Sequence, residues 1–273
     1  MADRDDILTE LGLTPVWRLR ASAQAVALDV EAIHDAPPDG RRDASLARRV
    51  SSTRDASPTE AVSTPNASDA RLDRIARIEW RDFAADVDAC TACGLCRARR
   101  KSVPGVGDAH AEWLFIGEAP GAEEDARGEP FVGQAGKLLD NMLAALGMNR
   151  GENVYIANVL KCRPPNNRTP EPLEVDSCRP YLDRQIALIE PKIIVALGKS
   201  AATTLLGVDA SIASLRGRVH RYRGVPLVVT YHPAYLLRNL PDKSKAWEDL
   251  LFARRTLRAA DASESPQSGT LKL

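Results

Sequence analysis

Residues 113–125 read WLFIGEAPGAEED, a short apolar run that passes directly into a turn rich in glycine and acidic residues. An apolar run of this length, bounded by turn residues, is typical of a strand buried on both faces. Three further runs have the same character: VYIAN (154–158), IIVALG (193–198) and LVVTY (227–231). Together they predict the four core strands of one sheet.

Helical patterns separate these runs, with helices expected near 133–147, 171–189, 199–206 and 243–258. Strands that alternate with helices imply a mostly parallel sheet covered on both faces. We therefore predict an α/β fold, a three-layer αβα sandwich around a central four-stranded sheet. In such folds ligands bind beyond the carboxyl ends of the strands.

Composition divides the rest of the chain. We expect a partner-binding helix within residues 1–30, although a dispensable extension is the simpler alternative. Residues 31–70 are rich in proline, serine and aspartate and are predicted to be a disordered linker, because they cannot bury enough apolar surface to offset the entropy lost on ordering. The folded domain is placed at 71–258, and 259–273 are expected to form a flexible tail.

Charge and targeting signals narrow the functional class. Formal net charge is zero, so any contact with DNA must come from local basic patches. No apolar run reaches the roughly 18 residues of a membrane span. The first ten residues lack the basic start and apolar stretch of a secretory signal, so a cytoplasmic location and a reducing environment are expected.

The cysteines form a pattern typical of a metal centre. Cys90 and Cys93 form a Cys-x2-Cys pair, and Cys162 and Cys178 follow far downstream. Without a secretory signal, thiolates gathered from distant segments suit a metal better than disulfides. The spacing alone allows either a tetrahedral zinc or an iron–sulfur cluster. Cys96 extends the pair and could compete as a ligand.

Polar or aromatic residues follow three of the predicted strands. The turn at Glu118 and Ala119 can present backbone N–H groups to an anion, and Phe131 lies shortly after it. Asn158 ends the second strand with a donor and an acceptor side by side. His232 follows the fourth and can donate to developing negative charge. Each alone is more often structural, but their conjunction indicates a site.

These residues belong to longer motifs. The segments are GEAPGAEEDARGEPFVGQAG (117–136), NVLKCRPP (158–165) and HPAYLLR (232–238), with CTAC (90–93) upstream and Cys178 downstream. In order and spacing they closely resemble the family 4 uracil-DNA glycosylases, bacterial and archaeal repair enzymes that carry a 4Fe–4S cluster. The resemblance covers about residues 80–255. It implies an enzyme that flips uracil out of DNA and hydrolyses its N-glycosidic bond, leaving an abasic site.

The resemblance assigns the base pocket. By matching position, Phe131 would stack on the flipped uracil, and Asn158 would hydrogen-bond its N3–H and O4, a pattern that cytosine reverses. Glu124 would fill the space beside C5, where the methyl group of thymine would clash. The alternative for Glu124 is a solvated acid in an acidic run.

The resemblance also assigns the catalytic groups. His232 and the backbone around Glu118 and Ala119 would stabilise the departing uracil anion. Ala119 stands where the best-known uracil-specific family places an aspartate that orients water. Glu118 is therefore the first candidate for positioning the water, and Glu124 is the second.

Contacts with uracil-containing DNA and with the cluster follow from the same resemblance. Leu236 matches the apolar wedge inserted into the duplex, with Tyr235 and Leu237 as substitutes, and Arg238 would contact a backbone phosphate. The ligands of the 4Fe–4S cluster would be the thiolates of Cys90, Cys93, Cys162 and Cys178, which leaves Cys96 as a free thiol. The cluster would be structural, ordering the loop between the last two ligands, and the protein is expected to be a monomer.

Two other functions compete with this interpretation. One is a non-catalytic iron–sulfur or zinc module that binds nucleic acid, although binding alone needs no pocket built from Asn158, Phe131 and His232. The other is the related branch that bonds covalently to the abasic product. That branch lacks the cysteine of the CRPP motif and carries a basic, histidine-containing insertion, neither of which fits this chain.

Overall fold

The computed structural model describes residues 67–264. The predicted partner-binding helix and most of the predicted linker lie outside the described residues. Helix α2 spans Ala67–Arg77, so regular structure begins inside the range predicted as linker. Helix α10 spans Lys243–Glu264, so the predicted tail is wrong as far as residue 264. Its alanine-rich end favours helix strongly enough to extend the element. Among the described residues, no helix is long and apolar enough to cross a membrane.

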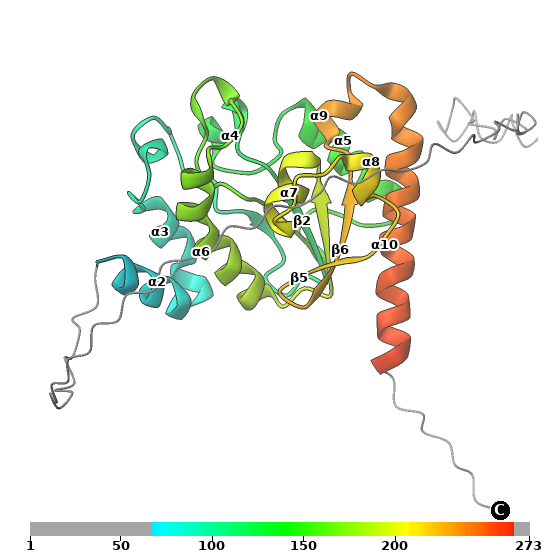
Figure 1. The fold of residues 1–273 in the computed structure, drawn as a ribbon, viewed down its shortest axis with the longest axis horizontal. Coiled ribbons are helices and arrows are strands. Elements are labelled where there is room, and N and C mark those ends of the chain that lie inside the picture. The colour runs from blue at the N-terminus through cyan, green and yellow to red at the C-terminus, as the bar shows by residue number, and fades with distance from the viewer. Residues whose placement is uncertain (1–66, 265–273) are drawn as a thin grey trace, which may run out of the picture. The chain divides into compact units, whose positions relative to one another are not determined.

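The predicted strands form the centre of one sheet (Figure 1). They are β2 (Trp113–Gly117), β3 (Val154–Asn158), β4 (Ile193–Leu197) and β6 (Val225–Thr230). They lie side by side in the order β3-β2-β4-β6, and every pair is parallel. The predicted α/β fold class is confirmed.

Two edge strands that the sequence pattern does not predict extend this sheet to six. β1 (Val106–Gly107) pairs antiparallel with β3, and β5 (His220–Tyr222) pairs antiparallel with β6. β1 has only two residues, and β5 reads HRY. Neither strand carries an apolar run. An edge strand is held mainly by backbone hydrogen bonds to one neighbour, so it does not need apolar side chains to form.

Alternate residues of the strands face two helical layers. Leu114 and Ile116 of β2 belong to a core with α6 (Pro172–Ile189) and α7 (Lys199–Leu206). Trp113 and Phe115 belong to a second core with α5 (Gln134–Ala145) and α10. The three-layer arrangement follows from this alternation, because each strand is buried on both sides.

Shorter elements connect the layers. They are α3 (Trp80–Asp88), α4 (Ala122–Arg127), α8 (Ile212–Leu215), α9 (Pro233–Leu236) and the 3-10 turns η1 (Gly94–Arg97), η2 (Pro165–Asn167) and η3 (Leu240–Asp242). α4 follows β2 and α9 follows β6, so both begin at the carboxyl edge of the sheet. α2 and α3 pack through Ile75 and Phe83 on Tyr181 of α6 and lead into the cysteine pair.

Candidate active site

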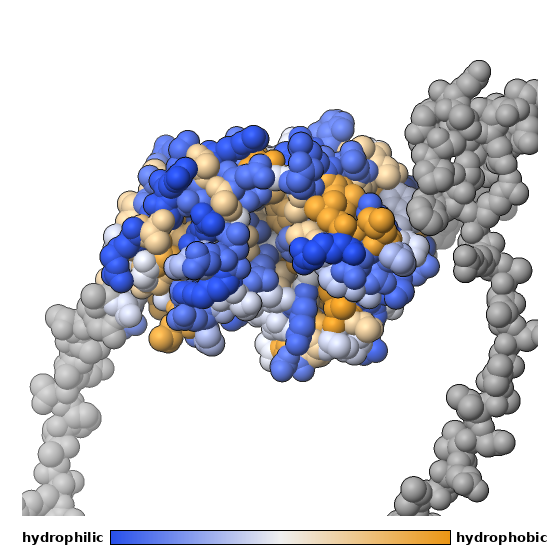
Figure 2. Space-filling model, turned by 90° about the horizontal axis from the view of Figure 1, so that it is seen from above, coloured by the Kyte–Doolittle hydropathy of each residue, from blue (hydrophilic) through white to orange (hydrophobic). Residues whose placement is uncertain are grey.

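A cleft of about 530 Å³ opens at the carboxyl ends of the parallel strands. Figure 2, seen from above, looks onto this face of the domain, which is largely hydrophilic with hydrophobic residues gathered to one side. The residues that line the cleft are Glu118, Ala119, Pro120, Gly121, Glu124, Phe131, Ala135, Asn158, Pro164, Asn167, Arg168, His232, Ala234, Tyr235 and Arg238. All six residues predicted for catalysis and base binding are in this set, which brings together segments more than 100 positions apart.

His232 caps the first turn of α9. Its Nδ1 accepts a hydrogen bond from the backbone N–H of Ala234 at 3.1 Å. A neutral imidazole has one donor and one acceptor nitrogen, so its proton lies on Nε2. Burial lowers the pKa of His232 to about 4, helped by the positive charge of Arg238 and opposed by Glu124. At neutral pH the ring is therefore an uncharged hydrogen-bond donor.

Phe131 adopts a backbone conformation that is uncommon for its residue type, with φ at +55°. Its ring stacks on the imidazole of His232, with 5.5 Å between ring centroids and 29° between planes. Gly117 makes room beneath it. A Cβ at that position would lie 2.6 Å from Cζ of Phe131 and 2.4 Å from Oδ1 of Asn158. A side chain at the end of β2 would therefore collide with two walls of the cleft.

Asn158 ends β3 and is only 2% exposed. Its Oδ1 is buried and has no hydrogen-bond partner among the described residues. Leaving such an acceptor unpaired costs roughly 1–3 kcal/mol, so unpaired polar atoms are rare inside proteins. This orphan acceptor belongs to a side chain that lines the cleft, where a ligand can satisfy it.

The two glutamates differ in their surroundings. Glu124 accepts from three backbone N–H groups, those of Gly121 at 3.1 Å, Val132 at 2.9 Å and Gly133 at 3.2 Å. Its carboxylate therefore connects the turn after β2 to the loop that carries Phe131. The alternative that Glu124 is a solvated acid is wrong. Burial raises the pKa of Glu118, and a hydrogen bond with Ser200 partly opposes the shift.

Helix α9 contradicts one predicted contact with DNA. Leu236 is 1% exposed and packs against Tyr231 and Ala246, so it is a core residue and not a wedge. Leu237 is 41% exposed and lies next to Arg238. Tyr235 is partly exposed, but its hydroxyl donates to Asp242 at 2.7 Å. Of the two neighbouring leucines at the end of α9, Leu237 is therefore the one whose side chain is exposed to solvent.

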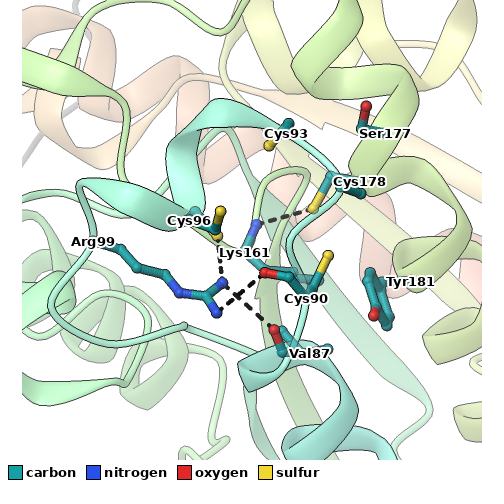
Figure 3. Close-up of a pocket in the computed structure, with 11 residues that line it drawn as sticks. Val87, Cys90, Cys93, Cys96, Arg99, Lys161, Ser177, Cys178 and Tyr181 are labelled. Carbon is teal, nitrogen blue, oxygen red and sulfur yellow. Dashed lines mark hydrogen bonds between the residues drawn. The ribbon is translucent and has the colours of Figure 1, made fainter.

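The cysteines meet at a second, much smaller cavity of about 20 Å³ (Figure 3). It is lined by all of the cysteines in the chain, Cys90, Cys93, Cys96, Cys162 and Cys178, and none of them forms a disulfide. They come from the segment after α3, from the loop after β3 and from α6. Within residues 67–264, no group of three or more Cys, His, Asp or Glu side chains is arranged to hold a metal ion.

Two cations that the cysteine motif does not predict, Arg99 and Lys161, lie beside the cysteines. Arg99 donates from Nη1 to Sγ of Cys162 at 2.8 Å. Lys161 is fully buried, and its Nζ donates to the main-chain oxygen of Asn158 at 2.9 Å and to Oε1 of Gln185. Burial lowers the pKa of Lys161 to about 8, against the opposing effect of the thiolates of Cys178 and Cys162. In the described part of the chain, Lys161 forms no ion pair with a carboxylate.

The loop between Cys162 and Cys178 connects the two cavities. Its residues Pro164, Asn167 and Arg168, which were not among the predicted site residues, line the cleft. Arg168 is held by both carboxylate oxygens of Glu174, at 2.9 Å and 2.6 Å. One wall of the cleft is thus a loop whose two ends enter the cysteine cavity.

Comparison with known proteins agrees with this geometry. Residues 104–251 match the uracil DNA glycosylase superfamily. The type-4 uracil-DNA glycosylase of Archaeoglobus fulgidus is 46% identical over 164 residues, which cover 57% of this chain and 82% of that protein. The type-4 enzyme of Thermotoga maritima is 48% identical over 56% of this chain and 80% of its own length.

A more distant relative is the type-5 uracil-DNA glycosylase of Thermus thermophilus, which is 31% identical over 55% of this chain and 86% of that protein. The higher identities to type-4 enzymes agree with the motif order found in the sequence. The chain belongs to the uracil-DNA glycosylase superfamily and, within it, to the type-4 family.

Proposed function

We propose that this protein removes uracil from DNA by binding the flipped base in the cleft and hydrolysing its N-glycosidic bond. The observation that carries the proposal is the convergence of Phe131, Asn158 and His232 on one cleft at the carboxyl edge of the sheet. A module that only binds nucleic acid needs no buried, unpaired amide oxygen at the bottom of such a cleft. The non-catalytic alternative is therefore not favoured.

Asn158 and Phe131 select the base. The unpaired Oδ1 of Asn158 accepts from N3–H of uracil, and Nδ2 donates to O4, while the ring of Phe131 supplies a stacking surface. Cytosine has an acceptor at N3 and a donor at its 4-amino group, so it would leave both polar atoms of the amide mispaired. Each mispaired buried group costs roughly 1–3 kcal/mol.

Glu124 excludes thymine. Its carboxylate is fixed by three backbone N–H groups and lines the cleft. A group held in this way cannot move aside cheaply for the extra methyl group at C5. The same contacts occupy both carboxylate oxygens, which makes Glu118 the better candidate for positioning the attacking water.

His232 stabilises the leaving group. When the glycosidic bond breaks, negative charge develops on N1 of uracil and is shared with O2. The proton on Nε2 can donate to that oxygen, assisted by backbone N–H groups of the turn at Glu118 and Ala119. A preorganised donor of this kind is worth on the order of two to three powers of ten in rate.

We infer that the cysteine cavity holds a 4Fe–4S cluster, the group that the resemblance to family 4 implies. Its lining includes Cys90, Cys93, Cys162 and Cys178, and four thiolates are the ligand set of such a cluster. Lys161 is buried and has no carboxylate partner in the described part of the chain. An anionic cluster beside it would balance its positive charge.

Cys90, Cys93, Cys162 and Cys178 would hold this cluster, which supplies a covalent anchor and no redox step. The chain between the last two ligands supplies Pro164, Asn167 and Arg168 to the cleft wall. Tying both ends of the loop would hold that wall in place against the DNA. Just after α9, Leu237 would enter the duplex and Arg238 would contact a phosphate.

A single-turnover assay tests the proposed function. Cluster-loaded wild type should cleave uracil-containing oligonucleotides and leave matched thymine and cytosine substrates intact. His232→Ala and Asn158→Ala should each slow uracil release by roughly a hundredfold or more. Equal rates for wild type and both variants would overturn the site assignment. No cleavage by the loaded wild type would favour the binding module.

A further inference from the structure

The loop between α5 and β3 carries an arginine that contacts the backbone of Phe131 on both sides. Nη1 of Arg150 donates to the carbonyl of Pro130 at 2.7 Å, and Nη2 donates to the carbonyl of Phe131 at 2.8 Å. These carbonyls belong to the peptide groups that precede and follow the Cα of Phe131. One guanidinium therefore fixes both peptide planes that set the direction of the ring.

The guanidinium of Arg150 is itself held by α5. Oδ1 of Asp140 accepts from Nε at 3.1 Å and from Nη2 at 2.8 Å. The arginine side chain is 22% exposed, whereas that of Asp140 is 48% exposed. Arg150 does not line the cleft, so it lies behind Phe131 and not beside the substrate.

Gly136 of α5 also contacts the backbone of Phe131. A Cβ at position 136 would lie 1.7 Å from the carbonyl oxygen of Phe131, so only glycine allows the helix to approach so closely. Gly136 and Asp140 are four residues apart and share one face of the helix. On this face of α5, Gly136 leaves space for the carbonyl of Phe131, and Asp140 supplies the carboxylate that orients Arg150.

Phe131 needs such support because its φ of +55° is unfavourable for a residue with a Cβ. If φ relaxed to a negative value, the Cβ would point in another direction and the ring would leave its stack on His232. Strained conformations persist only where the surrounding structure fixes them. Arg150 supplies two charge-assisted hydrogen bonds at this position.

We propose that Arg150 is a positioning residue for uracil recognition: together with Asp140 it holds the backbone of Phe131 so that the ring faces the flipped base. It touches neither substrate nor the reacting atoms. The inference rests on the proposed function and deepens it, because it identifies the group that keeps the stacking surface in place.

The test separates binding of the base from binding of the DNA. Arg150→Lys keeps the charge but cannot reproduce the forked donation to two carbonyls. We expect it to weaken inhibition by free uracil about tenfold, the scale of one lost base–aromatic stack. Affinity for a duplex with an abasic-site analogue should stay within about twofold, because no base occupies the pocket there. Asp140→Ala removes only the carboxylate that holds Arg150. It should also weaken inhibition by uracil without changing affinity for the abasic duplex, but by a smaller factor.

Arg223→Lys is the matched control, since Arg223 pairs with Asp183 and does not line the cleft. It should leave both affinities unchanged. Unchanged uracil inhibition in Arg150→Lys and Asp140→Ala would overturn the inference. Equal losses of affinity for uracil and for abasic DNA would also overturn it, because they would indicate a general structural role. If wild type excises uracil normally in that case, the proposed function survives. If wild type neither excises nor binds uracil, both fail.

Discussion

The chemistry of individual residues depends on a histidine that stays uncharged. Above pH 6.5 the imidazole of His232 is neutral in both the folded and the unfolded chain. As pH falls below that value, the unfolded chain takes up a proton that the folded protein resists, because the pKa in the folded state is about 4. The contribution to stability is thus complete above pH 6.5 and is lost as pH falls towards 4.

Comparison of wild type with His232→Gln isolates this effect, since the other titrating groups are common to both proteins. The free energy of unfolding of wild type, relative to the variant, should fall between pH 6 and pH 4 by at most about 1.4 kcal/mol per pH unit. Urea unfolding at several pH values measures the difference. A constant difference across this range would show that His232 keeps its ordinary pKa.

Among the site residues, the sequence could predict those that motifs or strand ends place together. Phe131, Asn158 and His232 were found this way. Lys161, Arg99 and Arg150 were not, because their roles depend on which carbonyl or sulfur the fold brings within reach. A basic residue near a cysteine or in a loop carries no such information by itself.

At the level of elements, the sheet illustrates the same limit. β2, β3, β4 and β6 are buried on both faces, so their apolar runs identify them directly. β1 and β5 form because a neighbouring strand offers free backbone groups, and no pattern of side chains marks them. The error at Leu236 has a related cause: α9 has only four residues, and tertiary packing decides which of its leucines faces inward.

Two neighbouring leucines offer a test at this scale. Leu236→Ala should lower the free energy of unfolding by roughly 2–5 kcal/mol, as expected for a fully buried leucine. Leu237→Ala should change stability by about 0.5 kcal/mol or less, yet slow uracil release from duplex DNA. Release from single-stranded DNA should change less, because there is no duplex to hold open.

The measurements are chemical denaturation and single-turnover rates on both substrates. If Leu237→Ala leaves the duplex rate intact while the fold is stable, Leu237 is not the wedge. The reverse pattern, with a stable Leu236→Ala that loses only duplex activity, would restore the prediction from sequence.

At the scale of the whole domain, the loop from Cys162 to Cys178 joins the cysteine cavity to the substrate cleft. Replacement of Cys162 by serine should lower bound iron and sulfide and free one end of this loop. We then expect faster tryptic cleavage after Arg168, which precedes Thr169, and slower uracil excision. Cys96→Ser is the control and should retain both iron and protease resistance. An iron-depleted Cys162→Ser protein with full activity and an intact loop would contradict the proposed structural role.

The cleft should hold a flipped uracil against the ring of Phe131 and read the polar edge of the base through Asn158. The most direct measurement is a crystal structure of the wild-type protein with free uracil. The base should lie against the ring of Phe131, with N3–H donating to Oδ1 of Asn158 and O2 facing Nε2 of His232. Uracil bound elsewhere, or bound in the cleft with Oδ1 of Asn158 still unpaired, would contradict this mode of base recognition.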